Sequence, residues 1–99
     1  MTRDEIFQLI RNNVIEVLGD KITPEDITIE KRLVDLGANS IDRGEIVVMT
    51  MEDVGVKVPL VELGKAKNIQ DLIEILYESK NSQVAGVVMQ ASGSIYKEQ

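Results

Sequence analysis

The segment "LGANSIDRGEIV", residues 36–47, leads from a loop into a helix and carries a serine at the junction. Gly37 predicts a sharp turn, and Ser40 begins a helix that is expected to run to about Val54 and to stop at Gly55. Serine is common at helix N-caps, where it stabilises a helix by about 1 kcal/mol. An exposed hydroxyl there can also receive a phosphodiester, because the N–H groups and the helix dipole favour an anion. Spacing alone favours the cap.

The sequence on either side of this segment predicts an all-α protein, a small antiparallel four-helix bundle with a long first loop. Thr2 and Glu5 form a capping box that begins the first helix. The first loop carries apolar residues such as Ile27, Leu33 and Leu36, so we expect it to lie across the core. Three main helices and one short helix are expected, at residues 2–18, 40–54, 60–63 and 69–80.

The end of the chain is expected to separate into a folded part and a tail. Asn68 is predicted to cap the last helix, with Asp71 at the third helical position. From Asn81 onward, polar residues surround one short apolar run, and no periodicity is sustained. We therefore expect one domain over residues 1–80 and a disordered tail over residues 81–99.

The composition argues against autonomous catalysis. The chain has no cysteine and no histidine, which excludes disulfides, thiolate metal sites, a cysteine nucleophile and the commonest general base. Neither a phosphate-binding glycine loop nor a calcium loop has the required spacing. We expect no metal site and no enzyme activity. If the chain takes part in catalysis, the reactive group must come from outside it.

The charge of the chain favours protein partners over nucleic acid. The formal net charge is −6, which a phosphate backbone would repel and a basic protein surface would complement. Arg3, Asp4 and Glu5 precede any apolar run, so the N-terminus does not resemble a signal peptide. No stretch approaches the roughly 20 apolar residues of a membrane span. We expect a cytoplasmic monomer that binds neither nucleic acid nor membrane.

The second helix has apolar residues on both sides, so periodicity alone does not identify the buried one. Because a helix at the outside of a small bundle exposes one side, the side with two glutamates is expected to face solvent. A glycine in the middle of this helix, at position 44, has two possible explanations, and both stay open. Either a partner approaches the backbone closely there, or Gly44 packs against the first loop. The side expected in solvent comprises Ile41, Gly44, Glu45, Val48, Met51 and Glu52, and the opposite side comprises Ile46, Val47, Thr50 and Val54.

The longer segment "LGANSIDRGEIVVMTMEDVGVKVP" resembles the signature of acyl carrier proteins, and "NIQDLIEIL" resembles the last helix of that family. The resemblance covers about residues 3–79. It implies that Ser40 carries 4'-phosphopantetheine, added from coenzyme A by a phosphopantetheinyl transferase, and that the thiol of this arm holds acyl thioesters. The cofactor would supply the thiol that the chain lacks. The matching positions are Gly37, Ser40, Ile41, Asp42, Glu45, Val58 and Pro59.

Three residues differ from the common acyl carrier protein signature, and these differences are typical of one subgroup of the family. Asn39 replaces the usual Asp before the serine, and Arg43 and Gly44 replace commoner small or aliphatic residues. In these details the chain is similar to the free-standing donor carriers of polyketide β-branching cassettes. The likeness implies loading with malonyl by a malonyl acyltransferase and decarboxylation to acetyl by a ketosynthase-like enzyme. The acetyl group would then pass to an enzyme resembling hydroxymethylglutaryl-CoA synthase.

Partner recognition is expected on the second helix, with an extension to the short third helix. Asp42 is expected to help a modifying enzyme hold its metal or its basic groups. Two alternatives stay open: a general fatty-acid or polyketide carrier, and an unmodified helical adaptor that binds partners through the same surface. The expected recognition residues are Ile41, Asp42, Arg43, Gly44, Glu45, Val48, Met51, Glu52 and Glu62.

Overall fold

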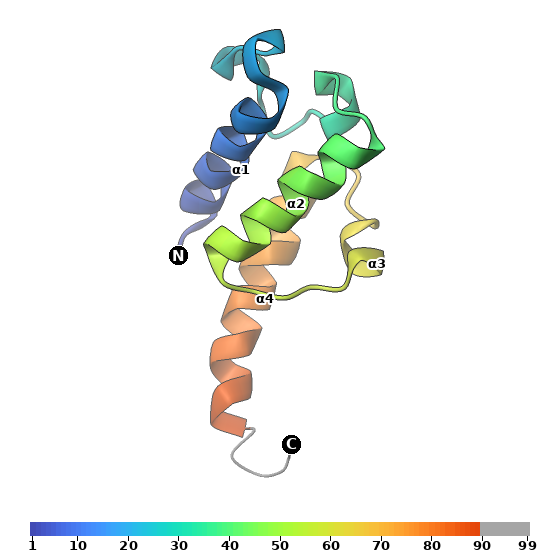
Figure 1. Cartoon of the computed structure of the whole chain (residues 1–99). Coiled ribbons are helices and arrows are strands. Elements are labelled where there is room, and N and C mark those ends of the chain that lie inside the picture. The colour runs from blue at the N-terminus through green and yellow to red at the C-terminus, as the bar shows by residue number, and fades with distance from the viewer. Residues whose placement is uncertain (90–99) are drawn as a thin grey trace.

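The protein is an all-α bundle, seen in a computed structural model that describes residues 1–89 and the side chains of residues 1–81. In Figure 1, α1 rises from the N-terminus, and α2 and α4 both descend, so α1 runs opposite to the other two. The short α3 lies beside α2 and joins it to α4. This arrangement confirms the predicted three main helices and one short helix. Their bounds are Arg3–Leu18 for α1, Ser40–Val54 for α2, Leu60–Leu63 for α3 and Ile69–Met89 for α4.

The predicted capping box begins α1. The Thr2 hydroxyl accepts a hydrogen bond from the Glu5 N–H at 3.1 Å, and the Glu5 carboxylate accepts one from the Thr2 N–H at 2.7 Å. The bond from the Thr2 backbone holds the pKa of the Glu5 carboxyl below its ordinary value. Gly19 ends the helix with a φ of 63°, a backbone region that favours glycine.

Aliphatic side chains make the core where α1 packs against α2 and α4. Burial of such side chains is the main favourable term in folding, at roughly 25 cal/mol per Å² of apolar surface. Each of the three long helices contributes residues from one apolar side. The three helices therefore pack with these sides together and bury them. The most deeply buried aliphatic residues are Ile6, Ile10, Val14, Ile46, Ile69 and Leu76.

One polar network crosses the interface between α1 and α2. The side-chain amide of Asn13 donates to the hydroxyl of Thr50 at 2.9 Å and to the carboxylate of Asp53 at 3.1 Å. The Thr50 hydroxyl in turn donates to the carbonyl oxygen of Ile46 at 2.8 Å. Because a buried polar group without a partner is costly, this network favours one register of α2 on α1.

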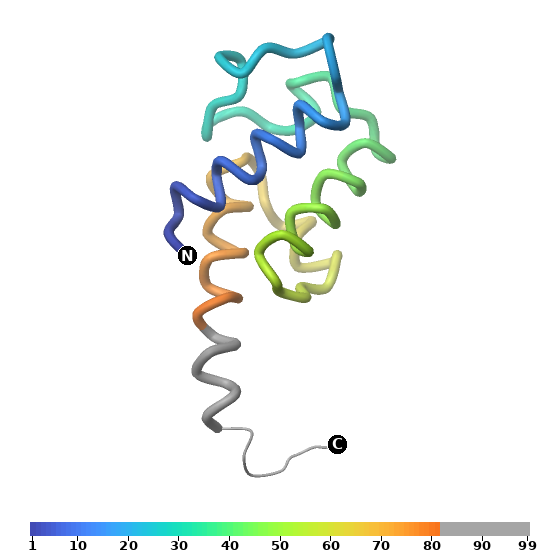
Figure 2. Tube along the Cα trace, turned by 60° about the vertical axis from the view of Figure 1, so that its left-hand side comes forward, coloured from blue at the N-terminus to red at the C-terminus, as the bar shows by residue number. Residues whose placement is uncertain are grey.

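The long connection between α1 and α2 closes one end of the bundle (Figure 2). Ile27 and Leu36 are buried in the core, as the sequence predicts. Two backbone hydrogen bonds, both 2.9 Å long, run from the N–H groups of Ile69 and Gln70 to carbonyl oxygens of this connection. They give partners to two N–H groups in the first turn of α4, which a helix cannot satisfy internally. The connection also contains a 3-10 helix, η3 (Leu33–Leu36), which lies just before the start of α2.

The last helix begins as predicted and extends further than predicted. The Asn68 side chain accepts a hydrogen bond from the Asp71 N–H at 2.9 Å. We expected the helix to end before Asn81, but α4 continues to Met89, since extending an existing helix costs far less than nucleating one. The division into a domain and a tail stays a prediction, and residues 90–99 lie outside the described residues. Within residues 1–89, no helix has both the length and the apolar character of a bilayer span.

Candidate functional site

Ser40 is the first residue of α2, but it is not the cap. The capping residue is Asn39, whose extended backbone lets its side-chain oxygen accept the Asp42 N–H at 2.8 Å. The Asp42 carboxylate completes the box by accepting the Asn39 N–H at 3.2 Å. The prediction that Ser40 caps the helix is therefore wrong. Asn39 performs that task because the residue three positions after it is an acid that can reciprocate.

The assignment of the cap to Asn39 leaves the Ser40 hydroxyl available. The Ser40 residue is exposed, and within the described part of the chain its hydroxyl takes part in no hydrogen bond. It stands at the positive end of the α2 dipole, beside N–H groups of the first turn. An exposed, unengaged hydroxyl in this position fits a phosphodiester-linked group.

The two sides of α2 lie as the sequence predicts. Ile46, Thr50 and Val54 are buried against the rest of the bundle. On the other side, the exposed fraction is 79% for Ile41 and 43% for Val48. The exposed aliphatic side chains are accompanied by exposed carboxylates of Glu45 and Glu52, which gives a surface of apolar and acidic groups next to Ser40.

Met51 departs from the expected exposed side. Its side chain is half-buried and packs against the core. The Val58 N–H donates to its sulfur atom at 3.4 Å, so Met51 supports the segment that leads to α3. A flexible thioether suits this role because it fills irregular space.

Gly44 lies in open space on the exposed side of α2. A Cβ atom built at this position would meet no atom within 4 Å. The reading in which Gly44 packs against the first loop is therefore wrong. The other reading, a close approach by a partner, stays a prediction.

The short helix α3 extends the surface with residues that sequence analysis missed. Glu62 is exposed, as expected for recognition, and its carboxylate pairs with the Lys65 ammonium at 3.0 Å. Leu60 and Val61 are also exposed, as is Val34 of η3. A signal was present in the sequence: a four-residue helix between Pro59 and Gly64 is too short to bury apolar residues on every side.

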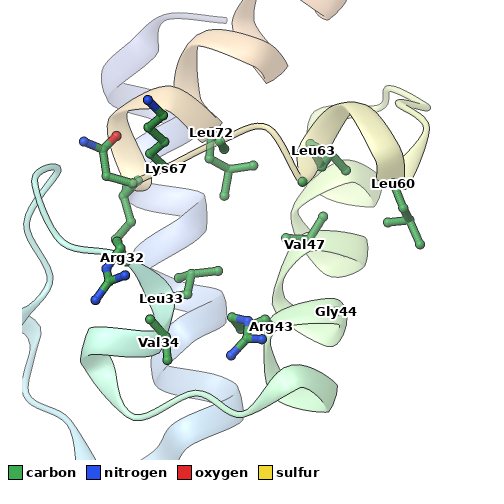
Figure 3. Close-up of a pocket in the computed structure, with 14 residues that line it drawn as sticks. Arg32, Leu33, Val34, Arg43, Gly44, Val47, Leu60, Leu63, Lys67 and Leu72 are labelled. Atoms are coloured by element: carbon green, nitrogen blue, oxygen red, sulfur yellow. The ribbon is translucent and has the colours of Figure 1, made fainter.

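A cavity of about 520 Å³ lies between η3, α2, α3 and the start of α4 (Figure 3). Gly44 opens onto it from α2, one turn after Ser40. Arg43 also lines it and is held by a hydrogen bond from its guanidinium to the carbonyl oxygen of Ala38 at 3.0 Å. The cavity therefore opens at α2 residues that lie three and four positions after Ser40 in the chain. Its apolar lining includes Leu33, Val34, Val47, Leu60, Leu63, Ile69 and Leu72.

Of the predicted recognition residues, the structure places most on the exposed surface and sets three apart, one of which is the half-buried Met51. Ile41, Glu45 and Val48 share the exposed side of α2. Arg43 instead lies half-buried at the cavity, and the carboxylate of Asp42 is turned back into the capping box. Recognition by these residues stays a prediction.

Comparisons with known proteins agree with this geometry. A family pattern described as a phosphopantetheine attachment site matches residues 8–76. The polyketide biosynthesis acyl carrier protein AcpK of Bacillus subtilis strain 168 is 42% identical over 86 residues, which are 83% of this chain and 99% of that protein. The acyl carrier protein of Campylobacter hominis is 33% identical over 70 residues, covering 70% of this chain and 86% of its own. The acyl carrier protein of Thermotoga maritima is 32% identical over 76 residues, covering 76% of this chain and 91% of that protein.

Proposed function

Because the chain belongs to the acyl carrier protein family, whose cofactor is 4'-phosphopantetheine, we propose that Ser40 is the residue that carries this arm. The observation that supports the proposal is the exposed Ser40 hydroxyl, left unengaged at the start of α2 because Asn39 makes the cap. Proteins of this family are carriers without catalytic activity of their own. The arm supplies the thiol for acyl thioesters, in a chain that has no cysteine.

In the proposed attachment reaction, Ser40 forms one new bond, between its side-chain oxygen and a phosphorus atom of coenzyme A. Its Oγ attacks the β-phosphorus of coenzyme A, so that an Oγ–P bond forms, the pyrophosphate P–O bond breaks and adenosine 3',5'-bisphosphate leaves. The serine proton goes to a base of the transferase. The first-turn N–H groups of α2 favour the phosphodiester charge. The Asp42 carboxylate, in the same first turn of α2, accepts a hydrogen bond from the Asn39 N–H at 3.2 Å.

Intact-mass spectrometry tests the attachment site. The full chain and its Ser40→Ala variant are incubated with coenzyme A and a broad-specificity phosphopantetheinyl transferase. We expect the parent to gain the mass of one arm and the variant to gain none. Equal modification of both proteins would move the site elsewhere, with Ser92 and Ser94 as the next residues to substitute. Because Ser40 does not cap α2, the variant is expected to fold.

We further propose that the carrier is the acetyl donor of polyketide β-branching. Support comes from the "NSIDR" and "MED" details of α2 and from similarity to a relative that is named for polyketide biosynthesis. The proposed partners are a malonyl acyltransferase, a decarboxylating ketosynthase-like enzyme and an enzyme resembling hydroxymethylglutaryl-CoA synthase, all in the cytoplasm. The exposed apolar and acidic surface of α2 suits basic partner surfaces.

A comparison of donors tests this role. The acetylated protein and an acetylated fatty-acid carrier are offered in turn to the synthase-like enzyme, and acetyl transfer is measured. We expect a clear preference for this protein. Equal use of both donors would favour a general carrier instead, an alternative supported by the likeness to the carriers of Campylobacter hominis and Thermotoga maritima.

A further inference from the structure

The cavity beside Ser40 carries the opposite charge from the rest of the protein. The chain has 17 acidic and 11 basic residues. Yet among the described residues that line the cavity there is no aspartate or glutamate, and there are three cations: Arg32, Arg43 and Lys67. A small acidic protein that collects only cations around one apolar cavity has a site suited to an anion.

Arg43 is the cation closest to the attachment site along the chain. It lies three residues after Ser40 on α2, a spacing that places two side chains on neighbouring positions of the helix surface. In Figure 3 its side chain lies beside α2, on the side that faces Val34. One guanidinium nitrogen donates to the Ala38 carbonyl. The group has five N–H donors, so further donors remain for a ligand.

The two other cations stand at the opposite rim and differ in how far their charge is already compensated. Arg32 pairs with the Asp35 carboxylate at 2.9 Å, and its side-chain hydrogen bonds hold the pKa of that carboxyl below its ordinary value. Within the part of the chain that the structure describes, neither Lys67 nor Arg43 forms an ion pair. Lys67 is exposed at the rim, and in Figure 3 its ammonium points away from Arg43. Its stem is long and flexible, so the ammonium turns toward the cavity only by a change of side-chain rotamer.

We propose that this cavity binds the free carboxylate of a malonyl cargo, with Arg43 as the principal contact and Lys67 as a second cation. The inference rests on the proposed function, since the cargo must be tethered at Ser40. A planar guanidinium matches a carboxylate in two parallel hydrogen bonds. A half-buried site screens this pair less than open solvent does. Tethering raises the effective concentration of the carboxylate near the cavity.

This site distinguishes the two cargoes of a donor carrier. Decarboxylation removes the carboxylate as CO₂ and leaves an acetyl thioester after the α-carbon takes up a proton. The acetyl group has no charge for Arg43 to bind. The cavity therefore holds malonyl before decarboxylation and retains acetyl more weakly afterwards, when acetyl must be available for transfer.

Thermal unfolding of two loaded forms tests the inference at neutral pH. The full chain is loaded from malonyl-coenzyme A or from isovaleryl-coenzyme A, whose two methyl groups replace the carboxylate oxygens without charge, and intact mass verifies each product. The malonyl form adds a negative charge to a protein of net charge −6, which by itself would lower its Tm. We expect instead that its Tm is higher than that of the isovaleryl form by about 2–6 °C at low salt and that the difference shrinks in 1 M NaCl.

Three variants assign the effect to the cavity. Arg43→Gln is expected to abolish the difference in Tm between the malonyl and isovaleryl forms, and Arg43→Lys to restore part of it. Lys65→Gln removes the same charge from the α3–α4 connection at a residue that does not line the cavity, and should leave the difference intact. The side-chain Nε resonance of Arg43 should move in the malonyl form only.

Each failure points to a different error. No mass gain on loading would refute attachment at Ser40, and the inference with it. Successful loading with a malonyl Tm at or below the isovaleryl Tm would overturn the inference and leave the carrier function intact. An equal loss in Arg43→Gln and Lys65→Gln would also overturn it, because only general charge would be involved. Free malonate added to the unloaded arm-bearing protein shows whether tethering is needed; an equal stabilisation by free malonate at millimolar concentration would overturn the role of the tether.

Discussion

The two sides of α2 carry the same kind of side chain for different purposes. Ile46 has none of its surface exposed, whereas Ile41, five residues earlier on the same helix, is 79% exposed. Both sides are aliphatic, but only the exposed side also carries Glu45 and Glu52. The comparison teaches that on this helix the position of the carboxylates, more than that of the aliphatic residues, identifies the side that stays exposed.

Alanine substitution of the two isoleucines should separate the two sides most strongly. Ile46→Ala leaves a cavity between α2 and α1, so we expect the free energy of unfolding to fall by about 2–5 kcal/mol. Ile41→Ala removes a side chain already in solvent, and the change should stay within about 0.5 kcal/mol. Urea denaturation of both variants, followed by circular dichroism, measures the difference.

The matched functional measurement should give the reverse order. Ile41→Ala is expected to lower kcat/KM of the phosphopantetheinyl transferase, because it removes the most exposed aliphatic side chain next to Ser40. Ile46→Ala, assayed at a temperature where it remains folded, should load almost normally. A strongly destabilised Ile41→Ala would mean that this side of α2 is a folding surface.

The sequence predicted the helices well because their ends carry strong local signals. The bounds of α2 follow from Gly55, and those of α3 follow from Pro59 and Gly64. The cap was assigned one residue too late because Asn39 and Ser40 are both good capping residues. The deciding signal was Asp42, which lies three residues after Asn39 and completes a capping box with it. The residue three positions after Ser40 is Arg43, which has no carboxylate to complete such a box.

The cavity could not be predicted from the sequence. Its lining comes from four elements that are distant in the chain, so its existence depends on how η3, α2, α3 and α4 pack together. Arg43 looked like part of the exposed recognition surface because it follows Asp42 directly. Its half-buried position arises from a hydrogen bond to Ala38, a backbone group whose location only the fold determines.

Substitutions at Asn39 and Ser40 should separate the cap from the proposed attachment site. Asn39→Ala removes the acceptor for the Asp42 N–H, and we expect the unfolding free energy to fall by about 1 kcal/mol. Ser40→Ala should change it by less than about 0.5 kcal/mol. Urea titrations measure both changes, and intact mass after incubation with the transferase should show an arm on Asn39→Ala only.

A conservative control keeps the capping geometry. Asn39→Asp retains an oxygen acceptor and restores the residue usual in acyl carrier proteins, so its stability should remain close to that of the parent. If Ser40→Ala were the more destabilised of the two alanine variants, the cap would belong to Ser40 after all.

The smallest change in unfolding free energy is expected for Gly44→Ala, which should stabilise the protein rather than destabilise it. A methyl group there meets no atom within 4 Å, and alanine is a better helix former than glycine. Gly44→Ala should therefore raise the unfolding free energy by about 0.5–1 kcal/mol. If a partner approaches the α2 backbone at this position, the same variant should be loaded or used for transfer more slowly.

Gly55→Ala provides the opposing control for this last prediction. Gly55 ends α2 with a φ of 84°, which alanine adopts at a cost, and a Cβ there would approach the Lys80 ammonium at 3.4 Å. We expect a loss of about 1 kcal/mol on urea unfolding, with loading at Ser40 unchanged. A more stable Gly44→Ala that every partner uses as fast as the parent would show that this glycine serves neither the fold nor a close approach.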